Sequence, residues 1–204
     1  MNLQVERSEI TFSLVGTDAK EQLSVGRIVL FNGPPSSGKT SLVRSLQRKI
    51  AEPWFHLSLD DFRSGYSNQW WDNDDGMLFD RVMASYLASL RQIALSGIDL
   101  LAEAVITPIR QSMYAKVFGE LPIVLVGVRW PLEIAVEREG NRTDRQRGPI
   151  ELPDADYAAV HSGLVYDFEV DTSRESPDEL ATKVDLNFTG FSASSFVSHL
   201  SQQR

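Results

Sequence analysis

Apolar and polar residues are arranged along this chain in two ways, and each predicts one type of secondary structure. Short continuous apolar runs predict buried strands, whereas segments with apolar residues at every third or fourth position predict amphipathic helices. Strands are predicted on this basis at residues 28–31, 54–59, 98–105, 123–128 and 168–170.

The predicted helices alternate with these strands and have recognisable ends. After the first strand, Leu42, Val43 and Leu46 recur at helical spacing, and Pro53 marks the end of that helix. A longer helix is predicted at residues 78–95, and Gly97 is suited to end it. Shorter helices are predicted at residues 108–118, 131–139, 155–162 and 177–184, and irregular segments at 62–76 and 141–153.

The alternation of strands and helices predicts an α/β fold with a five-stranded parallel sheet and helices on both of its faces. This fold is expected to occupy residues 27–188 as one domain. Residues 1–26 lack a clear period and are interpreted as an N-terminal extension. Residues 189–204 are mostly polar and are interpreted as a C-terminal tail or a weak helix.

Composition and charge exclude several classes of function. The 204 residues carry a formal net charge of -8, which argues against a broad nucleic-acid-binding surface. The absence of cysteine excludes disulfides and thiolate chemistry. No apolar run approaches the roughly 18 residues that a membrane span requires, and the N-terminus lacks the apolar core of a signal peptide. We therefore expect a cytoplasmic protein without nucleic-acid or membrane partners, either monomeric or homo-oligomeric.

A glycine-rich segment between the first strand and the first helix carries the strongest chemical signal. Residues 33–40 read GPPSSGKT, the phosphate-binding pattern of Gly, four residues and Gly-Lys-Thr. The backbone N–H groups of such a loop, together with the N-terminus of the following helix, bind phosphate oxygens. Lys39 would reach the outer phosphates, and Thr40 would offer a hydroxyl to Mg²⁺. The predicted nucleotide-binding residues are Gly33, Pro34, Pro35, Ser36, Ser37, Gly38, Lys39, Thr40 and Ser41.

Two carboxylates, Asp60 and Asp61, come directly after the second predicted strand. Ligands gather at the carboxyl ends of parallel strands, so Asp60 is expected at the same sheet edge as the phosphate loop. A carboxylate there could accept the proton of a hydroxyl group during phosphoryl transfer. The alternative is that Asp60 or, more simply, Asp61 caps a helix, because aspartate is a favoured N-cap residue.

Three classes of phosphate-loop protein compete for this pattern. A switch GTPase needs Asn-Lys-x-Asp and Asp-x-x-Gly, and neither pattern occurs in the chain. A motor or transport ATPase usually has four apolar residues before an Asp, whereas residues 100–103 read LLAE. Small-molecule kinases combine a carboxylate after the second strand with an Arg-rich lid after the fourth, as residues 138–147 would supply here. The pattern therefore favours a kinase with the three-layer P-loop NTPase fold and an Arg-rich lid.

Several stretches, taken together, resemble the chloramphenicol phosphotransferase family. They read RIVLFNGPPSSGKTSLVRSLQ, EPWFHLSLDDF, VGVRWPLEIAVERE, NRTDR and VHSGLVYDFEVDTSRESPDE, and they span residues 27 to about 181. Members of that family transfer the γ-phosphate of ATP to a hydroxyl of chloramphenicol. The resemblance therefore implies ATP, Mg²⁺, a small-molecule hydroxyl acceptor and a link to antibiotic resistance.

The resemblance also implies roles for individual residues. It implies that Asp60 is the catalytic base, that Lys39 is the loop lysine and that Thr40 is the hydroxyl on the magnesium side. It further implies a nucleotide-binding arginine, two catalytic lid arginines and an adenine-side loop. The nucleotide-binding arginine would be Arg138, and the catalytic lid arginines would be Arg142 and Arg145. The adenine-side loop would contain Asp171 and Thr172.

Two departures from the family pattern concern the acceptor side. The family's third strand ends in Asp-Asp, whereas this chain has Glu103-Ala104, and Glu103 could support a metal ion or pair with a lid arginine. Trp70 and Trp71 lie in an aperiodic polar stretch, where they could line a pocket or belong to the core. The residues expected at the acceptor are Asp60, Phe62, Trp70, Trp71 and Glu103.

These departures leave the acceptor open between chloramphenicol and another metabolite or nucleotide-sugar. A nucleotide-binding regulatory module without transferase activity is the alternative from a different class. We interpret His161 as a structural, hydrogen-bonding histidine rather than as a general base.

Overall fold

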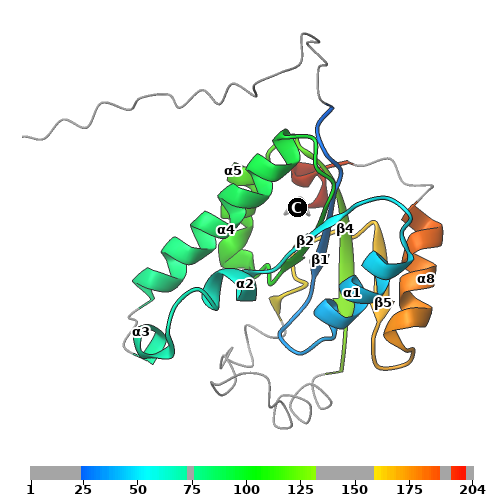
Figure 1. The fold of residues 1–204 in the computed structure, drawn as a ribbon, viewed down its shortest axis with the longest axis horizontal. Coiled ribbons are helices and arrows are strands. Elements are labelled where there is room, and N and C mark those ends of the chain that lie inside the picture. Colours follow the sequence, from blue (N-terminus) through cyan, green and yellow to red (C-terminus); the bar gives the residue numbers. More distant parts are fainter. Residues whose placement is uncertain (1–23, 73–75, 132–158, 189–193, 201–204) are drawn as a thin grey trace, which may run out of the picture.

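The computed structural model describes residues 24–72, 76–131, 159–188 and 194–200 of the chain (Figure 1). The expected helix at 131–139 and loop at 141–153 lie almost wholly outside these ranges, as does the first part of the helix expected at 155–162. The N-terminal extension also lies outside them up to residue 23.

A parallel β-sheet forms the centre of the domain. Its strands are β1 (Ile28–Asn32), β2 (Phe55–Leu57), β3 (Leu100–Ala104), β4 (Pro122–Arg129) and β5 (Phe168–Asp171), in the order β2-β3-β1-β4-β5. Strand β1 is therefore central, with β3 on one side and β4 on the other. The expected α/β fold with a parallel sheet is confirmed.

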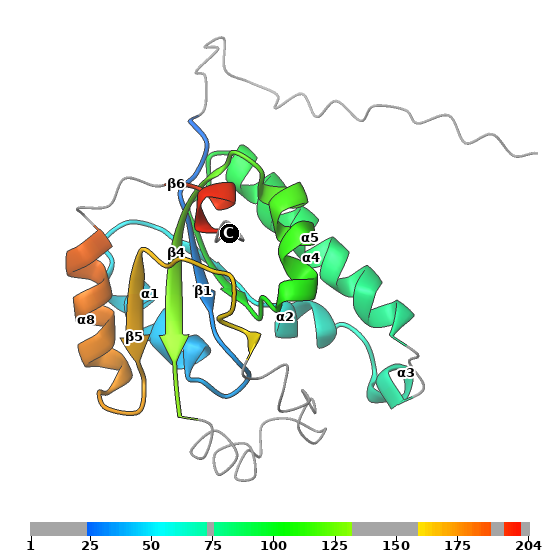
Figure 2. The ribbon, with the colours of Figure 1, turned by 180° about the vertical axis from the view of Figure 1, so that it is seen from behind.

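Helices cover both faces of the sheet (Figures 1 and 2). Helices α1 (Lys39–Lys49) and α8 (Pro177–Phe188) lie on one face. Helices α4 (Met77–Leu95) and α5 (Pro108–Phe118) lie on the other face, together with the short 3₁₀ helix η1 (Phe196–His199). The expected helices at 78–95, 108–118 and 177–184 agree closely with α4, α5 and the start of α8.

The two faces have separate cores because successive side chains of a strand point to opposite sides of the sheet. In β1, Val29 and Phe31 pack towards α1 and α8, whereas Ile28 and Leu30 pack towards α4 and α5. All four side chains are essentially inaccessible to water. Burial on both faces explains why β1 and β4 read as continuous apolar runs.

The second strand is shorter than expected, because helix α2 (Leu59–Arg63) already begins within the range expected for the strand. Strand β2 ends at Leu57, and Ser58 caps helix α2. The Ser58 hydroxyl accepts from the Asp61 N–H, and the Asp61 carboxylate accepts from the Ser58 N–H at 2.8 Å. This reciprocal pair is a capping box. The N-cap is therefore Ser58 and neither aspartate, although Asp61 takes part in the cap from the third position of the helix.

Two further segments differ from the expectation. Residues 62–76, expected to be irregular, contain the end of α2 and the short helix α3 (Asn68–Asp72), which lies at the far end of α4 from the sheet centre (Figures 1 and 2). The third strand begins at Leu100 and not at residue 98 as expected; just before it, the Asp99 carboxylate accepts from the Arg27 N–H.

Residues 194–200, which lie within the expected C-terminal tail, pack against the domain. Strand β6 (Ser194–Ser195) pairs antiparallel with β4, which adds a sixth strand to the five that were expected. Phe196 is fully buried, and its ring stacks on Tyr114 of α5 with centroids 5.9 Å apart. The boundary expected at residue 188 therefore does not separate these residues from the core.

No helix in the described ranges is long and apolar enough to cross a membrane.

Phe196 tests whether the C-terminal segment stabilises the domain. Removing a fully buried phenylalanine leaves a cavity, so Phe196→Ala should lower the free energy of unfolding by about 3–5 kcal/mol. Urea denaturation followed by circular dichroism measures this change. The neighbouring Val197, 47% exposed, is the matched control, and Val197→Ala should cost about 0.5 kcal/mol or less. Equal effects of the two substitutions would show that the segment is peripheral.

Candidate functional site

The phosphate-loop sequence forms a tight turn between the carboxyl end of β1 and the start of α1. Gly38, immediately before α1, has φ of 85°, and Ser36 has φ of 59°. Both values lie in the left-handed region of the backbone. Glycine adopts this region without strain, whereas it costs strain energy for a residue that has a side chain. Ser36 is held in this conformation as a non-glycine residue, which is common where backbone groups face a ligand.

Lys39, the first residue of α1, folds back over the loop. Its ammonium group donates to the carbonyl oxygens of Gly33 and Pro34 at 2.8 and 2.7 Å. The side chain is largely buried, and Ser37 beside it is fully buried. The loop is therefore closed by its own lysine, whose charge lies at the centre of the turn.

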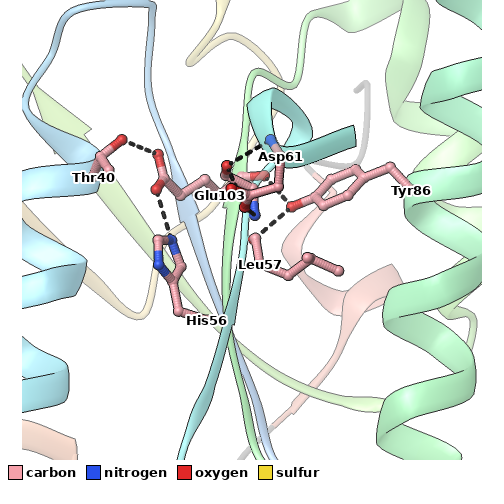
Figure 3. Close-up of polar contacts among 7 residues, drawn as sticks. Thr40, His56, Leu57, Asp61, Tyr86 and Glu103 are labelled. Carbon is pink, nitrogen blue, oxygen red and sulfur yellow. Dashed lines mark hydrogen bonds and ion pairs between the residues drawn. The ribbon is translucent and has the colours of Figure 1, made fainter. Parts of the chain in front are cut away.

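Glu103 lies directly opposite the start of α1, near the carboxyl end of the neighbouring strand β3. Its Oε2 accepts from the Thr40 hydroxyl at 2.9 Å, and its Oε1 accepts from Nε2 of His56 at 2.9 Å (Figure 3). The residue is only 7% exposed. A buried carboxylate is costly unless its oxygens are hydrogen-bonded, and here each oxygen has a partner.

This position of Glu103 differs from the acceptor-side position that we expected. The carboxylate contacts a residue of the phosphate loop, so it lies on the nucleotide side of the site. The sequence left open whether Glu103 supports a metal or pairs with a lid arginine. Its side chain bonds Thr40 and His56, and the lid arginines lie outside the described residues, so both alternatives stay predictions.

Tyr86 of α4 holds the ends of β2 and β3 together. Its hydroxyl lies 3.1 Å from the carbonyl oxygen of Leu57 and 2.7 Å from that of Glu103 (Figure 3). Burial raises the pKa of Tyr86 well above its usual value, so the phenol stays a neutral donor. The backbone that carries Glu103 is thus fixed from the opposite face of the sheet.

Asp60 lies in the first turn of α2, two residues after the cap, and not at the end of a strand as expected. Its side chain is 55% exposed, and its Oδ1 forms a long ion pair with the guanidinium of Arg63 at 3.4 Å. Asp61 takes the capping role described above. Of the two carboxylates, Asp60 is thus the one whose side chain is not used to cap the helix.

The two tryptophans expected at the acceptor have different environments. Trp71 is 8% exposed, its ring lies under the Arg63 guanidinium, and its N–H donates to the Arg63 carbonyl oxygen at 3.3 Å. Trp70 is 59% exposed. Phe62 packs edge-on against Tyr86 at the rim of the core. The structure therefore gathers Phe62 and Trp71 around α2 and leaves Trp70 at the surface.

Thr172, which follows Asp171 at the end of β5, lies beside the phosphate loop. The adenine-side role that the resemblance implies for these two residues stays a prediction. The Thr172 hydroxyl donates to the carbonyl oxygen of Ser37 at 2.6 Å. Burial opposes ionisation of Asp171, but bonds from Ser173 and the charge of Arg174 lower the pKa of Asp171 overall. An open cleft of about 270 Å³ lies here, lined by residues of α1 and by residues 172–177.

The predicted lid arginines, Arg138, Arg142 and Arg145, lie outside the described residues. Their proposed contacts with phosphate stay predictions.

A buried amide, which the sequence did not single out, joins several parts of the site. Asn32, the last residue of β1, accepts from the Ile106 N–H and donates to the carbonyl oxygen of Val160 and the hydroxyl of Tyr166, all within 2.9 Å. Tyr166 also bonds Nδ1 of His161 at 2.8 Å. His161 is thus a hydrogen-bonding residue in this network, as we interpreted it. The sequence contained one signal for Asn32, because this polar residue ends an apolar strand directly before the phosphate loop.

His56 was also missed. In the predicted strand it looked like a chance polar residue among apolar ones. Its position contained a signal, because His56 lies two residues after the buried Trp54. Residues two positions apart in a strand face the same side of the sheet.

Comparison with known proteins gives a consistent family assignment. The model of the family described as "Chloramphenicol phosphotransferase-like protein" matches residues 26–189. A Mycobacterium tuberculosis protein named "Putative O-phosphotransferase Rv2636" is 29% identical over 184 residues, which cover 78% of this chain and 80% of that protein.

Two solved structures are similar in fold. The unliganded structure of a sugar kinase from Janibacter has a TM-score of 0.57, with 18% identity, and covers 81% of this chain and 95% of its own. The APS kinase CysC from Mycobacterium tuberculosis, in complex with AMPPNP and APS, has a TM-score of 0.54, with 20% identity and coverages of 81% and 99%. At these identities the likeness concerns the fold alone.

His161 should make the protein less stable in acid. Burial, together with the charge of Arg129, lowers the pKa of His161 from 6.5 to about 4 in the folded state. Between these pH values the unfolded chain binds the proton more readily, so stability is lost as the pH falls through this window. His161→Asn keeps a hydrogen-bonding group near Tyr166 but cannot titrate. Urea denaturation at pH 7 and pH 5 should show a smaller loss for His161→Asn than for the wild type. An identical loss would contradict the assignment.

Proposed function

The chain belongs to the chloramphenicol phosphotransferase-like family of phosphate-loop phosphotransferases, and from this premise we propose that it transfers the γ-phosphate of ATP to a hydroxyl group of a small molecule. In this reaction the bond from the γ-phosphorus to the bridging oxygen of ADP breaks, and a bond from phosphorus to the acceptor oxygen forms. The hydroxyl proton passes to a carboxylate of the protein. The products are ADP and a phosphate ester.

The observation that carries the proposal is the position of a closed phosphate loop beside two carboxylates. Gly38 and Lys39 begin α1 at the carboxyl end of β1, Glu103 lies near the end of β3, and Asp60 follows β2. The sheet order brings these three strand ends to one edge. Phosphoryl transfer depends mainly on positioning and on neutralising charge, and this edge offers groups for both.

Lys39 supports the nucleotide half of the site. In the described structure its ammonium is bonded to two carbonyl oxygens of the loop. Phosphate oxygens of a bound nucleotide are stronger acceptors than these carbonyls and would take their place around the ammonium. Because the ammonium is already held over the turn, little reorganisation is needed for it to meet the β- and γ-phosphates.

The groups around Thr40 suit a magnesium ion. Thr40 Oγ1 and Glu103 Oε2 lie 2.9 Å apart, and both are hard oxygen donors, the type of ligand that Mg²⁺ prefers. Within the described ranges no group of three or more acidic, histidine or cysteine side chains could hold a metal. We propose that Thr40 and Glu103 would hold Mg²⁺ together with phosphate oxygens, and that the ion would supply positive charge that neutralises the phosphates.

The adenosine half of ATP is assigned to the cleft beside α1. Ser41 and Leu42 line the cleft on the side of α1, and Thr172 closes it on the side of the phosphate loop. Gly38, which also lines the cleft, has a φ of 85°, a backbone conformation that favours glycine over residues with a side chain. The lid arginines Arg138, Arg142 and Arg145 stay part of the proposal as the cations over the transferred group.

Asp60 is the proposed catalytic base. It is accessible to a substrate and is not used to cap α2. The Arg63 guanidinium, held against Trp71, lies on one side of the carboxylate and would restrict its orientation. Phe62 and Trp71 supply the apolar surface of the proposed acceptor site, and Trp70 its exposed rim.

The direct test is acceptor-dependent release of ADP. The purified protein should release ADP from ATP and Mg²⁺ when the right alcohol is added from a panel that includes chloramphenicol, sugars and nucleotide-sugars. Mass spectrometry should then detect an acceptor heavier by one phosphoryl group. ATP binding without turnover of any alcohol would support a regulatory nucleotide-binding module instead. No turnover with chloramphenicol would remove the antibiotic as the acceptor.

Asp60→Asn tests the base. Removing the proton acceptor should lower kcat by about 10²- to 10⁴-fold, while ATP affinity, measured by calorimetry, stays within about twofold of the wild type. Glu120→Gln is the control, because it makes the same chemical change at an exposed position beyond α5. Unchanged kcat in Asp60→Asn would refute the assignment of the base.

A further inference from the structure

His56 lies at an unusual place for a polar ring. It is the middle residue of β2, an edge strand of three residues, and its backbone is paired with Leu101 of β3. Its side chain is 13% exposed. The residues of the same parity in the two strands, Trp54 and Leu101, belong to the apolar core under α1.

The pairing of β2 and β3 explains how His56 reaches Glu103. Glu103 lies two residues beyond Leu101, so His56 and Glu103 are diagonal neighbours on the same face of the sheet. Phe31 of β1, which is paired with Glu103 on the other side, also faces α1. The first turn of α1 covers this face and brings the Thr40 hydroxyl to the carboxylate.

Each of the two carboxylate oxygens of Glu103 accepts a hydrogen bond from a different residue. Nε2–H of His56 holds Oε1, and the hydroxyl of Thr40 holds Oε2, each at 2.9 Å (Figure 3). A carboxylate can rotate about the bond to its side chain. The histidine fixes this rotation from the side away from the phosphate loop.

We propose that His56 is a positioning residue, which holds the Glu103 carboxylate so that Oε2 faces Thr40 on the magnesium side of the phosphate loop. This inference rests on the proposed function, because it assigns a purpose to the Glu103–Thr40 pair. His56 itself touches neither nucleotide nor ion in this arrangement and acts through Glu103.

Replacing His56 should lower the affinity of the site for Mg²⁺. Without the imidazole, Oε1 of a nearly buried carboxylate has no donor in the described structure, and rotation towards another donor moves Oε2 away from Thr40. Residues that orient metal ligands from behind typically change metal affinity by about 10- to 100-fold when they are replaced. A histidine that served only to stabilise the fold would lower stability without changing the dependence on the metal.

The test is the effect of Mg²⁺ on binding of the non-hydrolysable analogue AMPPNP. Calorimetry gives the Kd in excess Mg²⁺ and in EDTA, and the ratio of the two measures the contribution of the ion. His56→Leu should reduce this ratio about tenfold or more, whereas His56→Gln, which keeps an N–H donor at a similar reach, should stay within about threefold of the wild type.

Two further variants separate positioning from stability. His199 is another buried histidine, far from the phosphate loop in sequence and bonded near β6 and β4. His199→Leu should lower the Tm but leave the ratio unchanged. In a Glu103→Gln background, His56→Leu should have no further effect on the ratio, because the group that His56 positions has already been altered.

The outcomes are distinct. A wild type that binds AMPPNP in a Mg²⁺-dependent manner, with His56→Leu folded and its ratio unchanged, overturns the role of His56 and leaves the proposed function intact. An effect of His56→Leu that persists in Glu103→Gln also overturns it. If His56→Leu does not fold, a tenfold lower ratio in His56→Ala supports the proposal, and an unchanged ratio overturns it. A wild type that binds no AMPPNP under either condition overturns both.

Discussion

A carboxylate inside a parallel sheet imposes the main constraint on this structure. Glu103 stands in a strand whose other residues are apolar and buried, where an uncompensated charge would cost several kcal/mol. The fold meets that cost by bringing one donor from β2 and one from α1 to its two oxygens. The short edge strand β2, its neighbour β3 and helix α1 after the phosphate loop are therefore held to one another through a single polar group.

The order of the strands makes this arrangement possible. Since β3 lies between β1 and β2, a residue near its carboxyl end is next to both the phosphate loop and the start of α2. Tyr86 reaches the same point from the opposite face and fixes the backbone of Leu57 and Glu103. The proposed nucleotide and acceptor sides are thus built on adjoining elements, which suits the accurate positioning of reacting groups.

Local sequence patterns were sufficient for much of this fold. The phosphate loop, α4 and β4 were predicted closely, because their signals are confined to a few neighbouring residues. The start of α2 was predicted at the wrong place although its signal was local, because Ser58 and Asp61 have the spacing of a capping box. The apolar run before them led us to extend the strand over Ser58. The diagonal pair of His56 and Glu103, and the insertion of Phe196 between α5 and the sheet, depend on strand register and on distant packing. Neither can be obtained from a single sequence by periodicity.

Asn32 has a consequence for how the protein acquires its site during synthesis. The phosphate loop leaves the ribosome early, but the amide of Asn32 bonds to residues 74, 128 and 134 positions further along the chain. Contacts of such large sequence separation form slowly, because a long loop of chain must first be ordered. The base of the loop is thus completed only after residue 166 has emerged. Until then, the nascent chain carries the loop and its local contacts without the buried hydrogen bonds of Asn32 that fix its base.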